Sequence, residues 1–340
     1  MKILFKLSNV TIELLLVFLI FCNASTAQYY KVTTGVGVSN YQGDLSNGFI
    51  SDIGTAASLG LSYDLYDNFR LRANLSYLKV GADDSKSPKA SIKYRNLDFK
   101  TDIFELGLLG EIDLVNSQDY TLVPYLFGGP TIYHFNPYTK IKQTDITHAT
   151  DPNQLNLPVG LVSVGQKIYL HDVGTEGQII GGLEYLGGKK YSLTQLNIQI
   201  GGGLRYKISD GISIGYEFSF RKLFTDYLDD VSSKNYLSRD TWNNAIAAAT
   251  TANDKNKAKL LEQGEILSWR VLDNKGAPLP LKLGRPRGNP NANDAYFSSQ
   301  VRLNFTLFSK EGKNSVGNNK LFSPRNPSGR GQLNCPKLFY

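Results

Sequence analysis

Three carboxylates within five residues form the densest group of potentially reactive side chains in this chain. They belong to the segment "FTDYLDDVS", whose residues of interest are Thr225, Asp226, Tyr227, Asp229 and Asp230. Clustered carboxylates can bind Ca²⁺, but the alternating Asp positions and the glycine of an EF-hand loop are missing here. Acid–base or nucleophilic catalysis would need a suitably placed His or Ser partner. We therefore expect this segment to cap turns and order a loop.

Histidines give no stronger indication of a site. His134, His148 and His171 fall at or within one long connection, and their spacing does not match a metal motif such as His-Glu-x-x-His. The glycine-rich segment "GVGVSNYQG" is only superficially similar to a phosphate-binding loop, because no helical pattern follows it. We predict that the chain is not an enzyme and that it uses no metal or cofactor.

Many of the other charged residues lie in segments where polar and apolar residues alternate. In residues 194–208, Leu196, Ile198 and Ile200 share one face, whereas Asn197 and Gln199 share the other. A period of two is the pattern of a strand with one apolar and one polar surface. The same alternation predicts eight strands, at about residues 29–39, 55–65, 69–79, 97–114, 121–134, 194–208, 212–221 and 300–308.

Connection lengths indicate how these strands are arranged. Short connections at 66–68, 116–120 and 209–211 alternate with long ones at about 40–54, 80–96, 135–188 and 222–294. Short periplasmic turns and long outer loops are typical of an outer-membrane barrel. The predicted fold is an all-β, eight-stranded antiparallel transmembrane β-barrel over residues 28–308, with long extracellular loops. An even number of strands places both chain ends in the periplasm.

The alternation does not by itself show which face of the barrel is apolar. A soluble lipocalin-like barrel would show the same alternation with its apolar face inside, so alternation alone does not choose between a soluble and a transmembrane barrel. One short helix is expected in the last loop, in the Ala- and Lys-rich insertion at about 239–265, after an N-cap at Ser238 or Asp240.

If the polar faces point inward, charges of both signs meet inside the barrel. An eight-stranded barrel leaves a lumen that side chains just fill, and buried charges must be paired to be tolerated. We therefore expect a structural ion-pair network in preference to a catalytic or ion-conducting lumen. Its predicted members are Arg70, Arg72, Glu105, Glu111, Arg205, Glu217, Arg221 and Arg302.

The N-terminus has the pattern of a secretory signal peptide. Lys2 and Lys6 precede an apolar run at about 12–22, and small residues follow, so residues 1–27 are predicted to be removed by cleavage between Ala27 and Gln28. Cleavage would leave Cys335 as the remaining cysteine of an exported chain. A single cysteine there indicates an intermolecular disulfide or a free thiol.

Residues 309–340 form a predicted basic periplasmic tail. The tail holds most of the excess charge of a chain whose net charge is +7, and this charge is not distributed like a nucleic-acid footprint. We expect no nucleic-acid partner. The tail either meets an acidic protein, anionic lipid headgroups or the cell wall, or serves as a solvated linker.

Four segments resemble a known family. They are "RNLDFKTDIFELGLLGEIDL", "LHDVGTEGQ", "FTDYLDDVSSKNY" and "NCPKLF", in that order along nearly the whole mature chain. They are similar to the PorG-like outer-membrane barrels of the Bacteroidetes type IX secretion system. The combination of "TDYLDDVS" with "CPK" near the terminus is the more specific part of the likeness. The insertion at about 239–265 departs from the family pattern.

The resemblance implies a non-enzymatic barrel in outer-membrane lipid that associates with a periplasmic ring of a lipoprotein and its partner. That ring belongs to a machine that exports proteins and, in gliding species, supports adhesin movement. The candidate partner-binding residues are Arg325, Arg330, Cys335, Pro336 and Lys337, with Cys335 a candidate for an intermolecular disulfide. The alternatives are a solute pore or surface-binding barrel unrelated to secretion, and a barrel enzyme such as a protease or acyltransferase.

Overall fold

The computed structural model describes residues 30–46, 48, 52–117, 119–181, 190–209, 211–233, 235–282 and 287–307. The predicted signal peptide and the predicted tail therefore lie outside the described residues.

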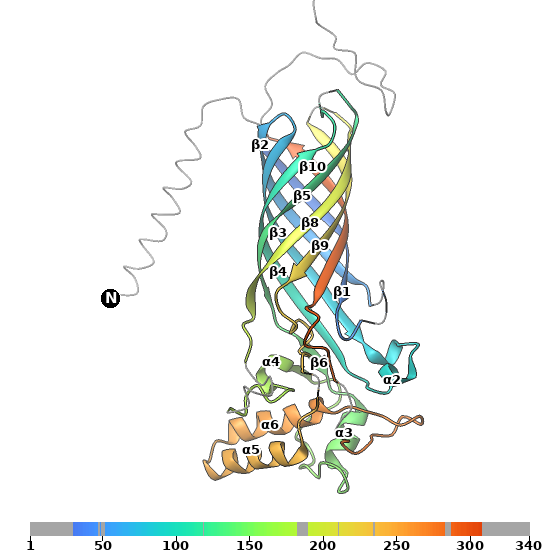
Figure 1. The fold of residues 1–340 in the computed structure, drawn as a ribbon, viewed down its shortest axis with the longest axis vertical. Helices are drawn as coiled ribbons and strands as arrows, with labels where there is room; N and C mark the ends of the chain where they lie inside the picture. Colours follow the sequence, from blue (N-terminus) through green and yellow to red (C-terminus); the bar gives the residue numbers. More distant parts are fainter. Residues whose placement is uncertain are drawn as a thin grey trace, which may run out of the picture.

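Eight strands close into an antiparallel barrel (Figure 1). Neighbours in chain order pair with each other, and β1 pairs with β10 from Lys31 opposite Thr306 to Gln42 opposite Ala295, which closes the ring. The strands are β1 (Tyr30–Gln42), β2 (Gly54–Tyr66), β3 (Phe69–Asp83), β4 (Asp98–Asp113), β5 (Leu122–Phe135), β8 (Thr194–Lys207), β9 (Ile212–Leu223) and β10 (Ala295–Thr306).

The apolar face of this barrel points outward. In β8, Leu196, Ile198 and Ile200 are 60%, 41% and 54% exposed, whereas Asn197 and Gln199 between them are 0% and 2% exposed. A soluble barrel would have the reverse arrangement, because its apolar residues fill the interior. With strands of 12 to 16 residues, longer than a bilayer requires, the fold is that of a transmembrane β-barrel.

Glycines in β8 make room for aromatic side chains inside the barrel. A Cβ atom on Gly201 would lie 2.4 Å from the Phe127 ring, and one on Gly203 would lie 2.6 Å from the Tyr125 hydroxyl. Glycine in a strand interior often marks such a close approach. Gly201 and Gly203 therefore let the rings of Phe127 and Tyr125 on β5 help fill the lumen.

The long connections fold into a cap at one end of the barrel (Figure 1). The cap contains a small hairpin of β6 (Tyr138–Lys140) and β7 (Lys167–Tyr169), with a buried core shared with the strand ends. Its helices are the 3₁₀ turn η1 (Asp84–Lys86), α2 (Ala90–Lys93), α3 (Gln143–Thr150), α4 (Leu170–Val173), α5 (Arg239–Thr251) and α6 (Lys255–Ser268). Within the described ranges, none of the helices is long and apolar enough to cross a membrane.

The predicted fold class is confirmed, and its predicted strands agree with the structure to within a few residues except at β10, which begins five residues earlier than expected. The helix predicted in the insertion at about 239–265 is present, but as the two helices α5 and α6. The predicted helix N-cap at Ser238 is present at the start of α5, and the Ser238 Oγ accepts a hydrogen bond from the Thr241 N–H at 3.2 Å. The helical stretch divides in two at Asn253, whose backbone has a left-handed φ of 57°. A new N-cap at Asp254 then starts α6.

The remaining helices are short and were not expected. α3 has eight residues, too few for a convincing helical period, and its Asp145 is held by contacts with a distant part of the chain. Helices of this length are marginal alone and depend on tertiary contacts. That dependence explains why local sequence patterns do not reveal them.

Candidate functional site

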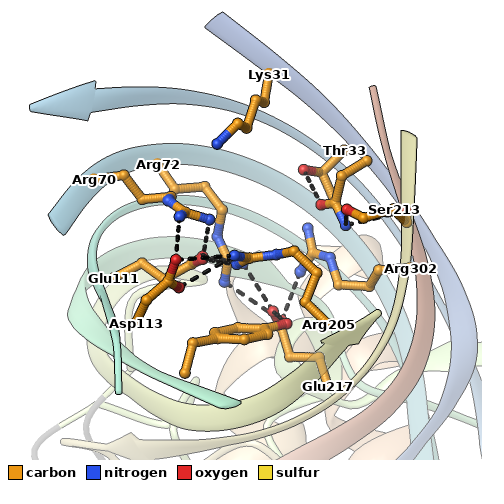
Figure 2. A network of polar contacts seen from close by, with 12 residues as sticks. Lys31, Thr33, Arg70, Arg72, Glu111, Asp113, Arg205, Ser213, Glu217 and Arg302 are labelled. Atoms are coloured by element: carbon orange, nitrogen blue, oxygen red, sulfur yellow. Dashed lines mark hydrogen bonds and ion pairs between the residues drawn. The ribbon is translucent and has the colours of Figure 1, made fainter. Parts of the chain in front are cut away.

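Seven charged side chains form a layer inside the barrel toward its short-turn end (Figure 2). Arg72 on β3 donates from Nη1 to Glu111 on β4 at 3.0 Å and to Glu217 on β9 at 2.8 Å. Arg302 on β10 donates to the other oxygen of Glu217 at 2.5 Å. The remaining members are Asp113 on β4 and the two arginines Arg70 and Arg205, each of which pairs with both Glu111 and Asp113. The lumen at this level is therefore filled by mutually paired groups.

A second charged layer lies further toward the cap. Arg221 on β9 pairs with Glu105 on β4 at 3.2 Å, and the Tyr296 hydroxyl on β10 donates to Glu105 at 2.5 Å. Arg221 also donates to the hydroxyls of Ser219 and Ser298, both at 2.7 Å. These contacts join three strands across the interior.

The structure places all eight charged residues selected from the sequence inside the barrel, and each of them is at least intermediate in burial and ion-paired. Sequence reasoning missed Asp113, which belongs to the first layer, and three residues that extend it. Asp64 pairs with Arg70, Lys31 pairs with Asp64, and Tyr125 donates to Glu217. Each continues the inward parity of its strand, so extending the alternation to the strand ends would have included them.

A tyrosine and two carboxyl groups connect the cap to the barrel mouth. The Tyr41 hydroxyl lies 2.6 Å from Asp229 Oδ2 and 2.8 Å from Asp294 Oδ1. A phenol has one hydrogen to donate, so one of the two carboxyl groups must itself carry a proton to satisfy both contacts. Burial raises the pKa of Asp229 and that of Asp294 well above the ordinary value, and the nearby charge of Asp294 raises the pKa of Asp229 further.

The other residues of the acidic segment order neighbouring loops. Asp230, in a left-handed backbone conformation, accepts hydrogen bonds from the hydroxyls of Thr175 at 2.6 Å and Tyr191 at 2.7 Å. Burial raises its pKa to about 6. The Thr225 carbonyl accepts from the Asp294 N–H at 3.1 Å. Tyr227 stacks on Tyr191 with ring centroids 4.7 Å apart. These contacts fix the acidic segment against the neighbouring loops that contain Thr175, Tyr191 and Asp294.

Asp226 is buried like its neighbours, with 6% of its surface exposed. It differs from them because neither of its carboxylate oxygens meets hydrogen-bond geometry with a described residue. Burial raises its pKa to about 7, and only the nearby Ser232 hydroxyl opposes that effect. A buried carboxyl without strong donors favours its protonated form. The carboxyl group of Asp226 is therefore expected to change its ionisation near neutral pH.

Buried ion pairs hold the cap loops together. Arg270 donates to both oxygens of Asp145, each at 2.8 Å, and to Asp98 at 2.6 Å. Arg287 pairs with Glu176 at 3.0 Å. These partners are more than 100 residues apart in the sequence, so no local spacing indicates them.

The structure brings together no metal centre from the described side chains. His134 and His171 contact Thr194 and the Tyr191 carbonyl respectively, and His148 is buried in the cap. Within the described ranges, no group of three His, Cys, Asp or Glu residues has a geometry that could hold a metal ion. That the chain is not an enzyme stays a prediction.

Several predicted site residues lie outside the described residues. They are the cleavage pair Ala27 and Gln28, and the tail residues Arg325, Arg330, Cys335, Pro336 and Lys337. Their predicted roles, and the predicted periplasmic partners, stay predictions.

Closed antiparallel pairing, an apolar exterior and an ion-paired interior together define a β-barrel of the outer-membrane class. The chain belongs to the family described as "Domain of unknown function (DUF6089)", whose model matches residues 10–195. No curated protein matches the sequence.

Solved structures similar to this chain include three outer-membrane proteins. Neisserial surface protein A is 8% identical, covers 83% of this chain and 98% of its own, and has a TM-score of 0.34. Ail of Yersinia pestis is 7% identical, covers 83% and 100%, and has a TM-score of 0.35. OprG of Pseudomonas aeruginosa is 8% identical, covers 84% and 97%, and has a TM-score of 0.34. The barrel class rests on the strand pairing and apolar exterior described above, not on these values.

Proposed function

We propose that this chain is a non-enzymatic outer-membrane component of the type IX secretion machinery that anchors a periplasmic lipoprotein ring and its partner. The observation that supports an anchoring role best is the combination of an apolar exterior with a lumen filled by ion pairs. Such a barrel is held in lipid and offers no open passage. In gliding species the same machine would also support adhesin movement.

The position of the strand ends is consistent with docking through the tail. Lys31 pairs with Thr306, and the Thr306 N–H donates to the carbonyl of Gly211 in a short turn at 2.8 Å. Both ends of the barrel sequence therefore lie at the short-turn end, opposite the cap. Under the proposal this end faces the periplasm, and residues 309–340 continue from it toward the ring.

A pull-down tests the proposal. The full chain and a chain ending at residue 308 are expressed with the same affinity tag, and ring proteins are expected only with the full chain. Replacing Arg325, Arg330 and Lys337 by Gln should reduce recovery, whereas the matched change of Lys310, Lys313 and Lys320 should reduce it less. Equal recovery with the shortened chain would contradict the proposal. Heat-modifiable electrophoretic mobility checks that each barrel has folded.

The proposed disulfide has its own test. Envelope fractions are separated by non-reducing electrophoresis, and the Cys335→Ser variant is expected to lose a higher-mass adduct that reducing agent also removes. If every adduct persists in the variant, the prediction of a covalent link through Cys335 is wrong. The pull-down then still tests docking without a covalent bond.

A second candidate is a surface-binding barrel unrelated to secretion. It is favoured by the cap, which is an ordered structure with its own buried ion pairs, such as Arg270 with Asp145. If this candidate is right, deleting the insertion at 239–265 abolishes surface binding, and the full chain recovers no ring proteins in the pull-down. A solute pore is less well supported, because paired charges cross the lumen.

A further inference from the structure

A group of exposed lysines lies on the outer surface where the barrel meets the cap. β6 and β7 extend the sheet beyond β4, since Lys100 on β4 pairs with Tyr138 on β6, which pairs with Tyr169 on β7. Thr139 and Ile168, which face inward on this extension, are buried. The opposite face continues the apolar exterior of the barrel. It carries three exposed lysines, here called the lysine patch: Lys100, Lys140 and Lys167.

The lysine patch begins where the apolar exterior of β4 ends. Leu106 and Phe104 are exposed, and Phe104 contacts Tyr77 on β3 with ring centroids 5.2 Å apart. Aromatic rings at the end of an apolar band mark the membrane–water interface. Four residues separate Phe104 from Lys100, which is about 13 Å along a strand and about 10 Å along the membrane normal once the strand tilts. Lysine side chains can reach back toward the interface, so the Lys100 ammonium lies at the level of the lipid headgroups.

Two tyrosines hold the Lys167 ammonium on the membrane side of the lysine patch. Lys167 Nζ lies 3.7 Å from the centroid of the Tyr138 ring and 4.6 Å from that of the Tyr169 ring. Cation–π attraction at these distances orients the ammonium toward the ring faces. Because Tyr138 pairs with Lys100, the charges of Lys167 and Lys100 lie at about the same level of the sheet.

The lysine patch has no counter-charge in the part of the chain that the structure describes. None of its three lysines forms an ion pair with a described residue, and Lys140 stands directly opposite Lys167. Like charges directly opposite each other destabilise a sheet. The two carboxyl groups on the same face of β4 already have cationic partners, in the pairs Asp102–Lys79 at 3.5 Å and Asp98–Lys142 at 2.8 Å. An anion from outside the chain would therefore stabilise this face.

We propose that the lysine patch binds the headgroup of a membrane lipid that carries a phosphate monoester, in the leaflet on the cap side. A phosphate monoester has a charge of about −1.5 to −2 near neutral pH and three acceptor oxygens. Three ammonium groups without counter-charges match it, because each has three hydrogens to donate. The acyl chains would lie against the exposed apolar residues of β4 next to the patch. This site is independent of the docking role of the tail.

Native mass spectrometry of the full mature chain tests the proposal. The delipidated protein in dodecyl maltoside is titrated with three lipids that share dioleoyl chains and differ in the headgroup. They are phosphatidic acid, which is a phosphate monoester, phosphatidylglycerol, which is an anionic diester, and phosphatidylcholine, which is zwitterionic. We expect phosphatidic acid to bind most tightly and phosphatidylcholine most weakly. Binding of either diester as tightly as phosphatidic acid would overturn the proposal.

Matched triple variants decide whether the lysine patch is responsible. Each basic residue at a membrane surface contributes about fivefold to the affinity for anionic lipid, so removing three should lower the affinity for phosphatidic acid about 100-fold. The test variant changes Lys100, Lys140 and Lys167 to Gln. The control changes three exposed lysines of the cap helix α6 to Gln and should leave the affinity unchanged: Lys255, Lys257 and Lys259. An equal loss in the two variants would show that net charge alone is responsible and would overturn the proposal.

A pair of single variants keeps the test decisive if the triple variant folds poorly, which heat-modifiable mobility detects. Lys100→Gln and Lys222→Gln each remove one exposed lysine from the cap end of a strand. Lys222 is on β9, three strands away from β4 in the ring and outside the lysine patch. The affinity should fall about fivefold in Lys100→Gln and stay unchanged in Lys222→Gln. Equal affinities of these two variants would overturn the proposal.

A soluble phosphate monoester distinguishes a lipid site from a site for free phosphate compounds. Glucose 1-phosphate is added at the same concentration as phosphatidic acid, and it should leave the bound lipid in place because it has no acyl chains to contact β4. Displacement of the lipid at equal concentration would assign the lysine patch to a soluble ligand and overturn the proposal.

Discussion

Arg72 and Glu217 join opposite walls of the barrel. β3 and β9 stand four strands apart in a ring of eight, yet Arg72 Nη1 lies 2.8 Å from Glu217 Oε2. Arg302 reaches the same carboxylate from the adjacent strand, at 2.5 Å. The two arginines therefore share one carboxylate near the axis of the lumen, and the side chains form a brace across it.

Replacing Glu217 by Met should destabilise the barrel strongly. Glu217 is the only described carboxylate within ion-pair distance of Arg302, so the substitution leaves a buried cation without a counter-charge. Removing one member of a buried pair typically costs about 3–5 kcal/mol. Urea unfolding, followed by heat-modifiable mobility, should show this loss.

The double variant Glu217→Met with Arg302→Met provides the control. It removes the unpaired cation as well, so it should be more stable than Glu217→Met alone. If the double variant is less stable by the sum of two independent losses, the coupling between these residues is wrong.

The unmodified barrel should not conduct ions. Arg72, Glu217 and Arg302 meet across the lumen, and a closed network leaves no continuous water path. In planar bilayers we expect no steady current from the wild-type chain and stepwise current after all three residues are changed to Ala. Steady conductance of the wild-type barrel, with or without residues 309–340, would contradict this prediction and favour the pore alternative.

The barrel itself is predictable because its determinants are local. Alternation in residues 194–208 fixes which side chains share a face, and the short connection at 209–211 fixes the pairing of β8 with β9. Local sequence does not determine whether the apolar face points inward or outward. The structure shows that it points outward, because Leu196 and Ile200 are exposed whereas Asn197 between them is buried.

The cap is much less predictable. Asp145 and Arg270 meet although 125 positions separate them, and nothing in their neighbouring residues indicates the pairing. Asp229 could be recognised as part of an acidic cluster, but its partner Tyr41 belongs to the first strand. Long loops of low periodicity reveal their contacts only once the barrel brings their ends together.

Tyr41→Phe and Asp294→Asn should have very different effects on stability. The first removes the group that both Asp229 and Asp294 contact, and leaving buried polar groups unsatisfied costs about 1–3 kcal/mol. In the second, the new amide can donate to the Tyr41 oxygen while its carbonyl accepts from the Leu228 N–H, as Asp294 Oδ2 does at 2.8 Å. Its cost near neutral pH should be small. Chemical denaturation of the three chains measures both effects, and equal losses would contradict the shared-proton arrangement.

Asp226 should make the cap less stable as the pH rises. Its pKa is raised to about 7 in the folded chain, from an ordinary value of 3.8, so the folded state binds more protons than the unfolded state between these limits. The free energy of unfolding therefore falls as the pH increases from about 4 to about 7, and the loss is complete above the folded pKa.

The variant Asp226→Asn should remove this contribution. Hydrogen exchange at Leu228 and Val231, whose N–H groups bind Asp294 and Asp229, reports opening of the segment. The difference in opening free energy between wild type and variant should change with pH over the window from 4 to 7 and become constant above it. Asp240→Asn, an exposed change in the same cap, controls for the loss of one charge. A difference that is flat with pH would show that Asp226 is ionised throughout and that its burial does not hold the proton.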